Sequence, residues 1–457
     1  MKSFRVLFCY VSMLLWSSAR VFSQATITQI LSNGPTTNRI NMVFLSEGYT
    51  ASQLGQFTND AKTILNYILS TPPFNAYQNY FNGYAISVAS VDSGSDHPLS
   101  GIYRNTYFNS TYDNYGIERL LTIPPNDLDG NYADGAGKVY TLLQALMPQY
   151  DLVAVIVNDP EYGGAGGGIL VTSMNSSSRE IAAHELGHTF AALGDEYSDA
   201  YPGWVPYEMP NVTQQTNRAL IKWTSWILGN TPVPTPDTSP YASVVGLFQG
   251  AEYQTTGWYR PKHICKMRVL GYPYCEVCAE ALVESIYSTI RPIESNAPDT
   301  NAATTLANSQ SVAFNVVTLQ PNTFNLSVQW FTNNVACSGA TNSSFTIYTT
   351  TLPFGSNQVR VEVTDTNPVV RTDPGQLLKD SRTWQVQILS PRMECQCWQS
   401  AIVLSWTTNA QGFMLEYKTN LDPLISWQPA GVPTVVSNRY TFTDSIDQNT
   451  KFYRLRN

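Results

Sequence analysis

Residues 176–197 read SSSREIAAHELGHTFAALGDEY, and they predict the helix around which the rest of the fold must be arranged. On an α-helix, side chains four residues apart share one face, so His184 and His188 would point the same way. Two imidazoles at this spacing can bind one metal ion, with Glu185 placed beside a water molecule rather than on the metal. The chain contains only four histidines, and two of them are here. The alternative is an ordinary helix whose histidines form hydrogen bonds near the surface.

A catalytic zinc site needs three protein ligands and an open position for water, and the helix supplies two of the three. Gly194 follows the helix and is expected to adopt the left-handed conformation that ends a helix and turns the chain back. Asp195 is then the best-placed third ligand, unless it only fixes the turn through hydrogen bonds to backbone amides. The alternative third ligands are Glu196, His263 and His97.

Glu185 is the predicted general base. Zinc lowers the pKa of bound water to about 7, so a neighbouring carboxylate can take a proton from that water as it attacks a carbonyl. The same carboxylate can pass the proton to the departing amine. The alternative is an exposed helical glutamate without a chemical role.

The sequence before this helix predicts an α/β domain. Apolar runs indicate strands at residues 38–46, 84–91, 151–157 and 169–173. Thr50 and Gln53 form a capping-box pattern at the start of a helix expected over residues 51–69. This order of strands and helices predicts that the histidine-bearing helix packs under a sheet.

The composition changes near residue 292, where a β-rich region begins. Strands with alternating apolar residues recur between turns rich in asparagine, glycine, proline and threonine, which is typical of a β-sandwich. Residues 297–392 are therefore predicted to form an immunoglobulin-like module, and residues 393–457 a small C-terminal β module. A module of that size needs support from a disulfide or from a neighbouring domain.

Residues 1–23 have the layout of a secretory signal peptide, with Lys2 and Arg5 before an apolar stretch and a cleavage site after Ser23. The protein is therefore expected to be secreted, at the cell surface or periplasmic, with its first domain over residues 24–292. No other segment approaches the roughly 18 apolar residues of a membrane span. The net charge of −8 and the lack of a basic stripe argue against a nucleic-acid partner.

All but one of the seven cysteines follow the signal peptide, and an even number in an exported chain favours disulfides. Three of them, Cys265, Cys275 and Cys278, are close in the sequence, with His263 nearby. They could form a structural zinc site of the Cys₃His type. A disulfide within the trio is the preferred interpretation for an exported protein, and the sequence does not determine the pairing.

Several separated stretches resemble the IgA-peptidase family of zinc metallopeptidases, which belongs to the zincins. They are INMVFLSEGYT at 40–50, SVDSGSDHP at 90–98, NDPEYGGAGG at 158–167, HELGHTFAALGDEY at 184–197 and YRPKHICKMRVLGYPYCEVC at 259–278. The resemblance implies a zincin-like α/β catalytic domain and an exported zinc endopeptidase that cleaves a protein or peptide substrate. It implies roles for His184, His188 and Glu185, but it does not imply that immunoglobulin is the substrate.

The resemblance to metzincins, a subgroup of the zincins, is incomplete. Their extended pattern has a glycine three residues and a ligand six residues after the second histidine. Ala191 and Gly194 occupy these positions here, and Asp195 comes one residue late. Residues 265–268, CKMR, resemble the methionine turn below metzincin zinc sites, with Met267 packed beneath the histidines. The alternative for Met267 is an ordinary core methionine.

Two further segments are candidates for binding. As in zincins, Gly166, Gly167 and Gly168 would let an extended substrate approach the edge of a strand, and the alternative is a mobile surface loop. Asp92 and Asp96 could bind a structural calcium ion, although acidic turns are more often only solvated. Candidate oxyanion stabilisers, which the sequence cannot rank, are Tyr162, Tyr197, Tyr259, Tyr272 and Tyr274.

Two other functions are consistent with the sequence. One is a binding protein without catalytic activity, whose β modules recognise a glycan or a protein. The other is a zinc amidase that acts on a non-protein substrate. The intact set of His184, Glu185 and His188 favours an enzyme, and a cleft for an extended peptide would favour an endopeptidase over an amidase.

Overall fold

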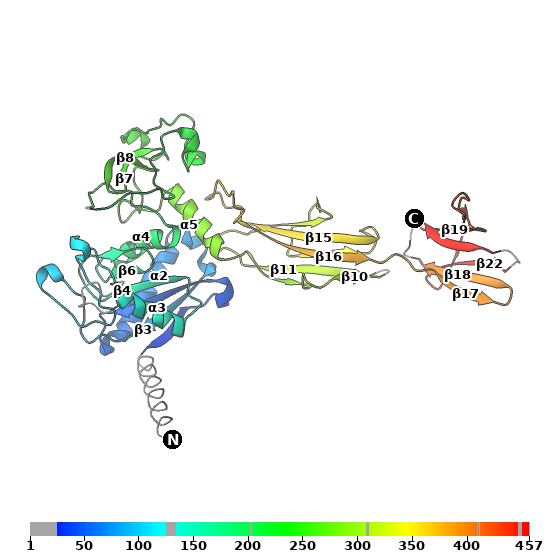
Figure 1. Ribbon diagram of the computed structural model, residues 1–457, viewed down its shortest axis with the longest axis horizontal. Coiled ribbons are helices and arrows are strands. Elements are labelled where there is room, and N and C mark those ends of the chain that lie inside the picture. The colour runs from blue at the N-terminus through cyan, green and yellow to red at the C-terminus, as the bar shows by residue number, and fades with distance from the viewer. Residues whose placement is uncertain are drawn as a thin grey trace, which may run out of the picture. The chain divides into compact units, whose positions relative to one another are not determined.

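The computed structural model describes residues 25–124, 134–201, 203–307, 310–408, 410, 412–446 and 450–456. The chain is divided into two compact units (Figure 1). The first unit contains the chain up to Pro292 and two later segments, Leu319–Leu326 and Asp365–Leu378. The second unit contains Ile293–Thr318, Ser327–Thr364 and Lys379–Asn457. The signal peptide predicted at residues 1–23 lies outside the described residues.

The first unit contains a six-stranded sheet in the order β1-β3-β2-β4-β6-β5. Its strands are β1 (Thr26–Leu31), β2 (Ile40–Glu47), β3 (Phe81–Ser87), β4 (Leu152–Val157), β5 (Gly164–Ala165) and β6 (Leu170–Ser173). The four inner strands run parallel, and β1 and β5 pair antiparallel at the two edges. Every residue of β2, β3 and β4 is buried, as expected for parallel strands that are covered on both faces.

The described helices of the first unit cover both faces of this sheet. They are α2 (Leu54–Ser70), α3 (Gly135–Leu146), α4 (Ser178–Ala191) and α5 (Glu276–Thr289). Successive side chains of β2 point to opposite faces, so Phe44 joins the core formed with α2, α4 and α5, and Val43 joins the core formed with α3. Helix α4 contacts α2, α5 and β6, so it lies under one face of the sheet.

Local sequence patterns predict most of these elements, with some shifts. The backbone N–H of Thr50 donates to Gln53 Oε1 over 2.9 Å in the predicted capping box, but a 3₁₀ turn, Ala51–Gln53, comes before α2. The strand predicted at residues 84–91 is displaced, because the chain enters the sheet at Phe81 and leaves it after Ser87. Between α4 and α5, the described residues contain only one pair of strands, β7 (Phe248–Ala251) and β8 (Gln254–Arg260).

A buried carboxylate attaches a late segment of the chain to the first unit. Asp365 Oδ2 accepts hydrogen bonds from the hydroxyls of Tyr77, at 2.6 Å, and Tyr287, at 2.7 Å. Tyr77 lies before β3 and Tyr287 lies in α5, so one carboxylate joins three separated parts of the chain. The backbone N–H of Arg371 also donates to Glu280 Oε1 on α5 over 2.7 Å. The first unit therefore depends on residues far beyond Pro292.

The second unit begins with two sheets, in the orders β10-β16-β15-β12-β13 and β14-β11-β9. Trp384 of β16 stacks with Trp330 of β12 and packs against the tilted ring of Phe314 of β11, with ring centroids 5.7 Å and 5.0 Å away. The two sheets therefore share one core. The strands are β9 (Ile293–Ala297), β10 (Thr304–Leu306), β11 (Ser311–Thr318), β12 (Ser327–Thr332), β13 (Val335–Ala336), β14 (Ser344–Tyr348), β15 (Gly355–Thr364) and β16 (Lys379–Ile388).

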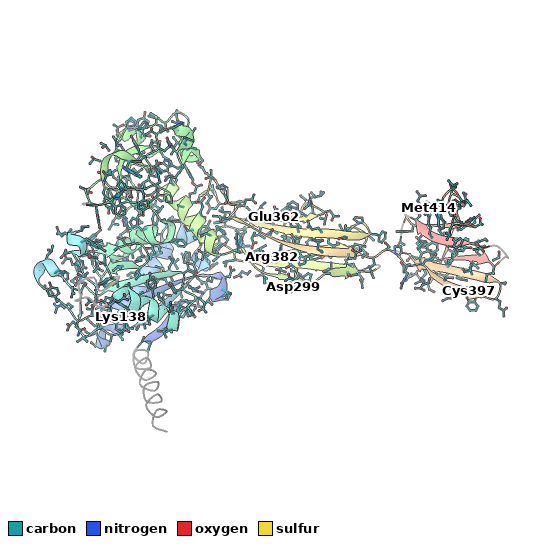
Figure 2. All side chains as sticks on the ribbon, viewed as in Figure 1. Lys138, Asp299, Glu362, Arg382, Cys397 and Met414 are labelled. Atoms are coloured by element: carbon teal, nitrogen blue, oxygen red, sulfur yellow. The ribbon has the colours of Figure 1, made fainter. Side chains whose placement is uncertain are left out.

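The last part of the chain forms two smaller sheets, in the orders β17-β18-β22-β21 and β20-β19-β23. Leu404, Trp406 and Leu415 form its core. Cys397 lies exposed on β17, where Figure 2 labels it, and it is a free thiol. The strands are β17 (Glu394–Trp398), β18 (Ala401–Thr407), β19 (Met414–Lys418), β20 (Gln428–Pro429), β21 (Thr434–Val436), β22 (Arg439–Ser445) and β23 (Phe452–Arg456).

The protein is thus rich in β-structure, with several separate sheets and few α-helices in its described residues. Among the same residues, none of the helices has both the length and the apolar character needed to cross a membrane.

Candidate active site

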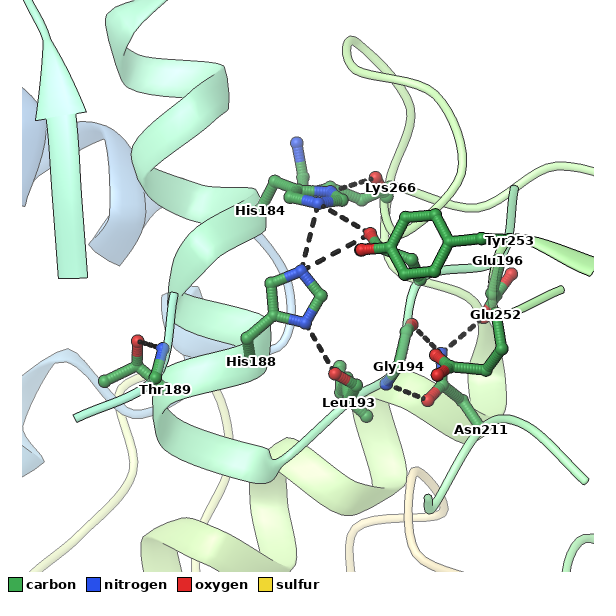
Figure 3. Close-up of polar contacts among 12 residues, drawn as sticks. His184, His188, Thr189, Leu193, Gly194, Glu196, Asn211, Glu252, Tyr253 and Lys266 are labelled. Carbon is green, nitrogen blue, oxygen red and sulfur yellow. Dashed lines mark hydrogen bonds and ion pairs between the residues drawn. The ribbon is translucent and has the colours of Figure 1, made fainter. Parts of the chain in front are cut away.

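Helix α4 brings its two histidines together, and the chain beyond the helix adds a carboxylate. The Nε2 atoms of His184 and His188 are 3.2 Å apart (Figure 3). Asp195 Oδ1 lies 3.1 Å from His184 Nε2 and 3.4 Å from His188 Nε2. The three side chains that the sequence predicts as metal ligands therefore meet at one point, and they form a group that could hold a metal ion.

None of the alternative third ligands lies beside the histidines. The carboxylate of Glu196 is directed elsewhere, with Oε1 3.2 Å from Cys278 Sγ. His97 and His263 each pair with a different aspartate. Among the side chains considered, only Asp195 approaches both imidazoles.

Backbone carbonyls determine which nitrogen of each imidazole carries the proton. His184 Nδ1 is 3.0 Å from the Lys266 carbonyl oxygen, and His188 Nδ1 is 2.6 Å from the Leu193 carbonyl oxygen. Because a carbonyl only accepts, both Nδ1 atoms must donate, and in the neutral rings both Nε2 atoms present lone pairs to the common point. Asp195 Oδ1 is buried there without a hydrogen-bond donor. Three acceptors facing one another need a positive charge between them, and nitrogen and carboxylate donors fit zinc.

The charges around this point also favour a cation. Burial lowers the pKa of His188, but the carboxylates of Asp195 and Glu185 outweigh that effect and raise it to about 10. Burial acts to raise the pKa of the Asp195 carboxyl, yet the two imidazoles hold it well below its usual range. Both shifts mean that the buried carboxylate is stabilised by a neighbouring positive charge. A divalent cation would supply that charge without a proton.

The turn after α4 differs from the predicted one. Ala192, not Gly194, adopts the left-handed conformation, with φ 50° and ψ 37°, so the prediction for Gly194 is wrong. Gly194 is needed for a different reason, since a Cβ there would lie 2.5 Å from Glu252 Oε1. Asn211 fixes this backbone by accepting from the Gly194 N–H at 2.7 Å and donating to its carbonyl at 2.9 Å. The turn thus directs the Leu193 carbonyl to His188 and sends Asp195 back to the site.

Two residues that sequence reasoning missed hold Asp195 in place. The hydroxyl of Tyr253 donates to Asp195 Oδ2, and the backbone N–H of Glu252 donates to the Asp195 carbonyl over 2.9 Å. Both residues have positive φ angles, 54° for Glu252 and 61° for Tyr253, in the turn between β7 and β8. Trp204 Nε1 in turn donates to Glu252 Oε2 over 3.0 Å. No local pattern marks these residues, because they follow Asp195 by more than 50 positions.

Glu185 lies beside the histidines in the wall of a cavity of about 850 Å³. Burial raises the pKa of its carboxyl above the usual value, and the two imidazoles act in the opposite direction. Of the tyrosines considered as oxyanion stabilisers, Tyr162 and Tyr197 line the same cavity. The hydroxyl of Tyr274 instead donates to the Ala183 carbonyl.

The glycine segment passes close to α4. A Cβ on Gly166 would lie 2.6 Å from the Cβ of His188, so only glycine allows this approach. Gly167 has φ 116°, and its N–H donates to Thr189 Oγ1 over 3.2 Å. Gly166 and Gly167 line the cavity, whereas Gly168 is not among its described lining residues and is adjacent to Tyr140.

Met267 lies buried beneath α4. A Cβ on Gly187, between the two histidines in sequence, would be 2.6 Å from Met267 Sδ. The Met267 carbonyl accepts the backbone N–H of Glu196 over 2.9 Å. The segment that contains Met267 therefore contacts both the helix and the chain next to Asp195.

Cys265, Cys275 and Cys278 form a buried cluster with Glu196, not with His263. Every cysteine in the described part of the chain is a free thiol, so the disulfide preferred within this trio is not formed. The three thiols share their pocket with a carboxylate instead.

The proposed calcium ligands have backbone partners. Asp92 Oδ2 accepts the N–H of Asn105 at 2.8 Å, and Asp96 Oδ1 accepts the N–H of Arg104 at 2.5 Å. Two groups of described residues could hold a metal ion, and neither includes Asp92 or Asp96.

Comparisons with known proteins add a family assignment. The model of the family described as IgA Peptidase M64 matches residues 28–239 and 237–286, which include His184, Glu185, His188 and Asp195. No curated protein matches the chain. A solved structure of the insect immune protein hemolin is similar to 35% of this chain and 44% of that chain, at 10% identity and a TM-score of 0.17, which is too low to support an argument. The family match covers more than half of the sequence, and the chain therefore belongs to the IgA peptidase M64 family of metallopeptidases.

Proposed function

We propose that the protein is a secreted zinc-dependent endopeptidase. One observation carries this proposal: two imidazole lone pairs and a buried carboxylate oxygen converge beside Glu185 in a cavity wall. Membership of a metallopeptidase family supports it. The proposal goes beyond family membership in three respects: the identity of the metal, the role of Glu185 and the path of the substrate.

His184, His188 and Asp195 would hold the zinc ion, since a catalytic site has three protein ligands and one open position. When bound, zinc polarises the scissile carbonyl and lowers the pKa of a water molecule to about 7. The carbonyls of Lys266 and Leu193 keep both imidazoles turned with Nε2 towards the ion. Partners of this kind orient metal ligands and raise their basicity.

Glu185 would act as the general base. It follows His184 directly, so its carboxylate reaches the cavity beside the ligand cluster and not within it. Its raised pKa suits a group that takes a proton and returns it. The carboxylate removes one proton from water as the water oxygen bonds to the carbonyl carbon. It then delivers that proton to the amide nitrogen as the C–N bond breaks, which leaves a carboxylic acid and an amine.

An extended peptide would bind along the edge strand β5. Such an edge binds the main chain of a peptide through hydrogen bonds, so it can bind peptides of many sequences. Leu120 already forms a β-bridge with Gly164, so the available part of this edge begins at Ala165 and continues through Gly166 and Gly167. This path passes beside Glu185 and His188, which supports cleavage within a peptide chain.

We also infer the domain classes and the location of the protein. The first unit is zincin-like, because its mixed sheet covers the helix that carries both histidines. Residues 297–392, apart from the two segments Leu319–Leu326 and Asp365–Leu378 of the first unit, form an immunoglobulin-like module, since two sheets share a tryptophan-containing core. Residues 393–457 form a small β module. Export is supported by the signal-peptide pattern of residues 1–23.

Cleavage of a diverse peptide library, with and without a zinc chelator, tests the proposed function. We expect chelator-sensitive cleavage at internal peptide bonds. Glu185→Gln should lower kcat/KM on the order of 10²–10⁴-fold, because an amide cannot accept the proton. Zinc content should remain unchanged, since Glu185 is not a ligand. Glu394→Gln, on the exposed strand β17, is the matched control and should keep wild-type activity.

The alternatives give different results in the same experiment. Full activity of Glu185→Gln, or cleavage that survives complete zinc removal, would contradict the mechanism. Peptide binding without cleavage by the zinc-loaded protein would favour a binding protein. Hydrolysis of small amides but of no peptide would favour a zinc amidase.

A further inference from the structure

We propose that the protein has a second metal site, a closed structural zinc site formed by Cys265, Cys275, Cys278 and Glu196. The four ligand atoms lie within 4.8 Å of one another, and all four residues are buried. The site does not depend on the proposed peptidase activity. It is separate from the site formed by the histidines.

The distances in the cluster match tetrahedral coordination. Cys278 Sγ is 3.6 Å from both Cys265 Sγ and Cys275 Sγ, and 3.2 Å from Glu196 Oε1. With zinc–sulfur bonds of about 2.3 Å, tetrahedral geometry places two thiolate sulfurs about 3.8 Å apart. The sulfurs of a disulfide are only about 2.05 Å apart. One additional atom at the centre of the cluster could therefore contact all four ligands.

Glu196 distinguishes this cluster from three thiols that are merely packed in a core. Its side chain is 0% exposed, and its Oε2 atom is buried without a hydrogen-bond partner in the described structure. Oε1 accepts from Asn211 Nδ2 at 2.9 Å, but no lysine or arginine within the described ranges forms an ion pair with this carboxylate. The charge of Arg260 acts on this carboxylate, but Arg260 forms its ion pair with Asp237. A buried carboxylate without an ion pair of its own is costly. A divalent cation between Glu196 and the three sulfurs would remove that cost.

The local backbone also suits thiolate ligands. Cys275 and Cys278 have the two-residue spacing common in zinc sites, and they lie at the N-terminus of α5. The positive end of that helix stabilises negative sulfur. The backbone N–H of Cys275 donates to Cys265 Sγ over 3.2 Å. Soft thiolates select zinc over harder divalent cations, and three of them with one carboxylate carry the same charge as a four-cysteine site.

The site has a defined structural role. Through its ligands it joins the loop at Cys265, the start of α5 and the chain after α4. Glu196 follows Asp195 directly, and its backbone N–H is held by the Met267 carbonyl. Zinc at the cysteines would therefore fix the chain on which Asp195 lies. Because all ligands are buried, no position is open to substrate.

Metal content and sulfur coordination of the purified, intact protein test the proposal. We expect about two zinc ions per chain, one for each site. Zinc X-ray absorption should show sulfur neighbours at about 2.3 Å in the wild-type protein. This measurement needs no variant, so it stands even if cysteine substitutions prevent folding. Cobalt in place of zinc should give an intense thiolate-to-cobalt charge-transfer band.

Variants separate the two sites. The double variant His184→Ala and His188→Ala should lose about half of the metal and keep the charge-transfer band. Cys278→Ala should lose the band, and Glu196→Gln should weaken metal retention at the cysteines. Cys397→Ala, an exposed free thiol, is the matched control and should change neither signal.

Three results would overturn the proposal. The first is about one zinc per chain with only nitrogen and oxygen neighbours. The second is a disulfide between any two of Cys265, Cys275 and Cys278, found by mass spectrometry of unreduced, alkylated peptides. The third is a charge-transfer band that survives Cys278→Ala. None of these results tests the role of Glu185. If Glu185 is not the general base, Glu185→Gln will keep full activity.

Discussion

Each proposed ligand of the catalytic zinc has a second polar atom bonded to another part of the chain. The carbonyls of Lys266 and Leu193 accept from the Nδ1 atoms of the imidazoles, and Tyr253 donates to the free oxygen of Asp195. These bonds limit the rotation of the ligands. The residues around the site therefore set its geometry as much as the ligands themselves.

Tyr253→Phe tests this dependence. Removing the hydroxyl leaves Asp195 Oδ2 without its donor, so zinc affinity should fall roughly 10–100-fold. Competition with a chromophoric chelator measures the affinity directly. Tyr348→Phe, on the exposed face of β14, should bind zinc like the wild type. Equal zinc affinity in the Tyr253 variant would show that the hydroxyl does not position the carboxylate.

Sequence reasoning reaches only part of this arrangement. The spacing of His184 and His188 is a local helical pattern, and Asp195 follows closely enough for a single turn to return it. Tyr253 and the Lys266 carbonyl approach from 58 and 82 positions away, so only the tertiary fold reveals them. The residue that contacts the cysteines is Glu196, because α4 and α5 pack together and bring distant segments into contact.

The segment that follows β5 lies close against α4. Gly166 and Gly194 are both at positions where a Cβ would collide with a neighbour. The sequence predicts a left-handed conformation for Gly194, whereas in the structure Gly194 is required because a Cβ would collide with Glu252. A glycine needed for close packing has the same sequence signature as one needed for a turn, so the sequence alone could not separate them.

Gly166→Ala should force the segment directly after β5 away from α4. Its new Cβ would lie 2.6 Å from His188 Cβ, so this segment or the helix must shift. Such overpacking costs about 1–3 kcal/mol, and displacement of the substrate strand should lower kcat/KM on the order of 10²-fold. Steady-state kinetics and thermal unfolding measure the two effects. Gly55→Ala, at the start of α2 with nothing within 4 Å, should leave activity unchanged.

Glu47, at the end of β2, should make the stability of the protein depend on pH. Its buried carboxyl accepts from Thr106, Phe108 and Ser110, yet burial outweighs these bonds and raises its pKa. The folded state therefore binds the proton more tightly than the unfolded state. This contribution to stability is full below the unfolded pKa of about 4.3 and is lost as the pH rises through the raised folded pKa.

Denaturant unfolding of the wild type and of Glu47→Gln at several pH values tests in which direction the contribution of Glu47 to stability changes with pH. The wild type should gain stability relative to the variant as the pH is lowered from about 7 towards about 5. Glu394→Gln, which is exposed, should show no such change relative to the wild type. A difference that grew with rising pH would mean that the pKa of Glu47 is lowered by folding.

For the whole molecule, the order of the chain does not coincide with the order of its compact units. Leu319–Leu326 and Asp365–Leu378 fold with the first unit, although β-strands of the second unit surround them in the sequence. Alternating apolar residues predict each strand, but they carry no information about which unit a connecting loop joins. The hydrogen bonds to Asp365 supply that information.

Asp365→Ala should destabilise the first unit. The hydroxyls of Tyr77 and Tyr287 would be left buried without their acceptor, at a cost of about 2–4 kcal/mol. Calorimetry should show a lower unfolding temperature for the transition in which activity is lost. Asp299→Ala, which Figure 2 labels in the second unit, is exposed and should leave that transition unchanged. An unaltered transition in Asp365→Ala would show that the late segment is dispensable.

Asp195 and Glu196 are neighbours in a piece of chain without regular secondary structure, and their side chains belong to different groups of potential metal ligands. A single peptide unit therefore connects the two proposed metal sites and limits how far apart they can lie. Insertion or deletion of one residue here would move at least one of the two carboxylates out of its pocket. The buried cysteine cluster would therefore hold Glu196 in place and, through it, fix the position of the neighbouring Asp195.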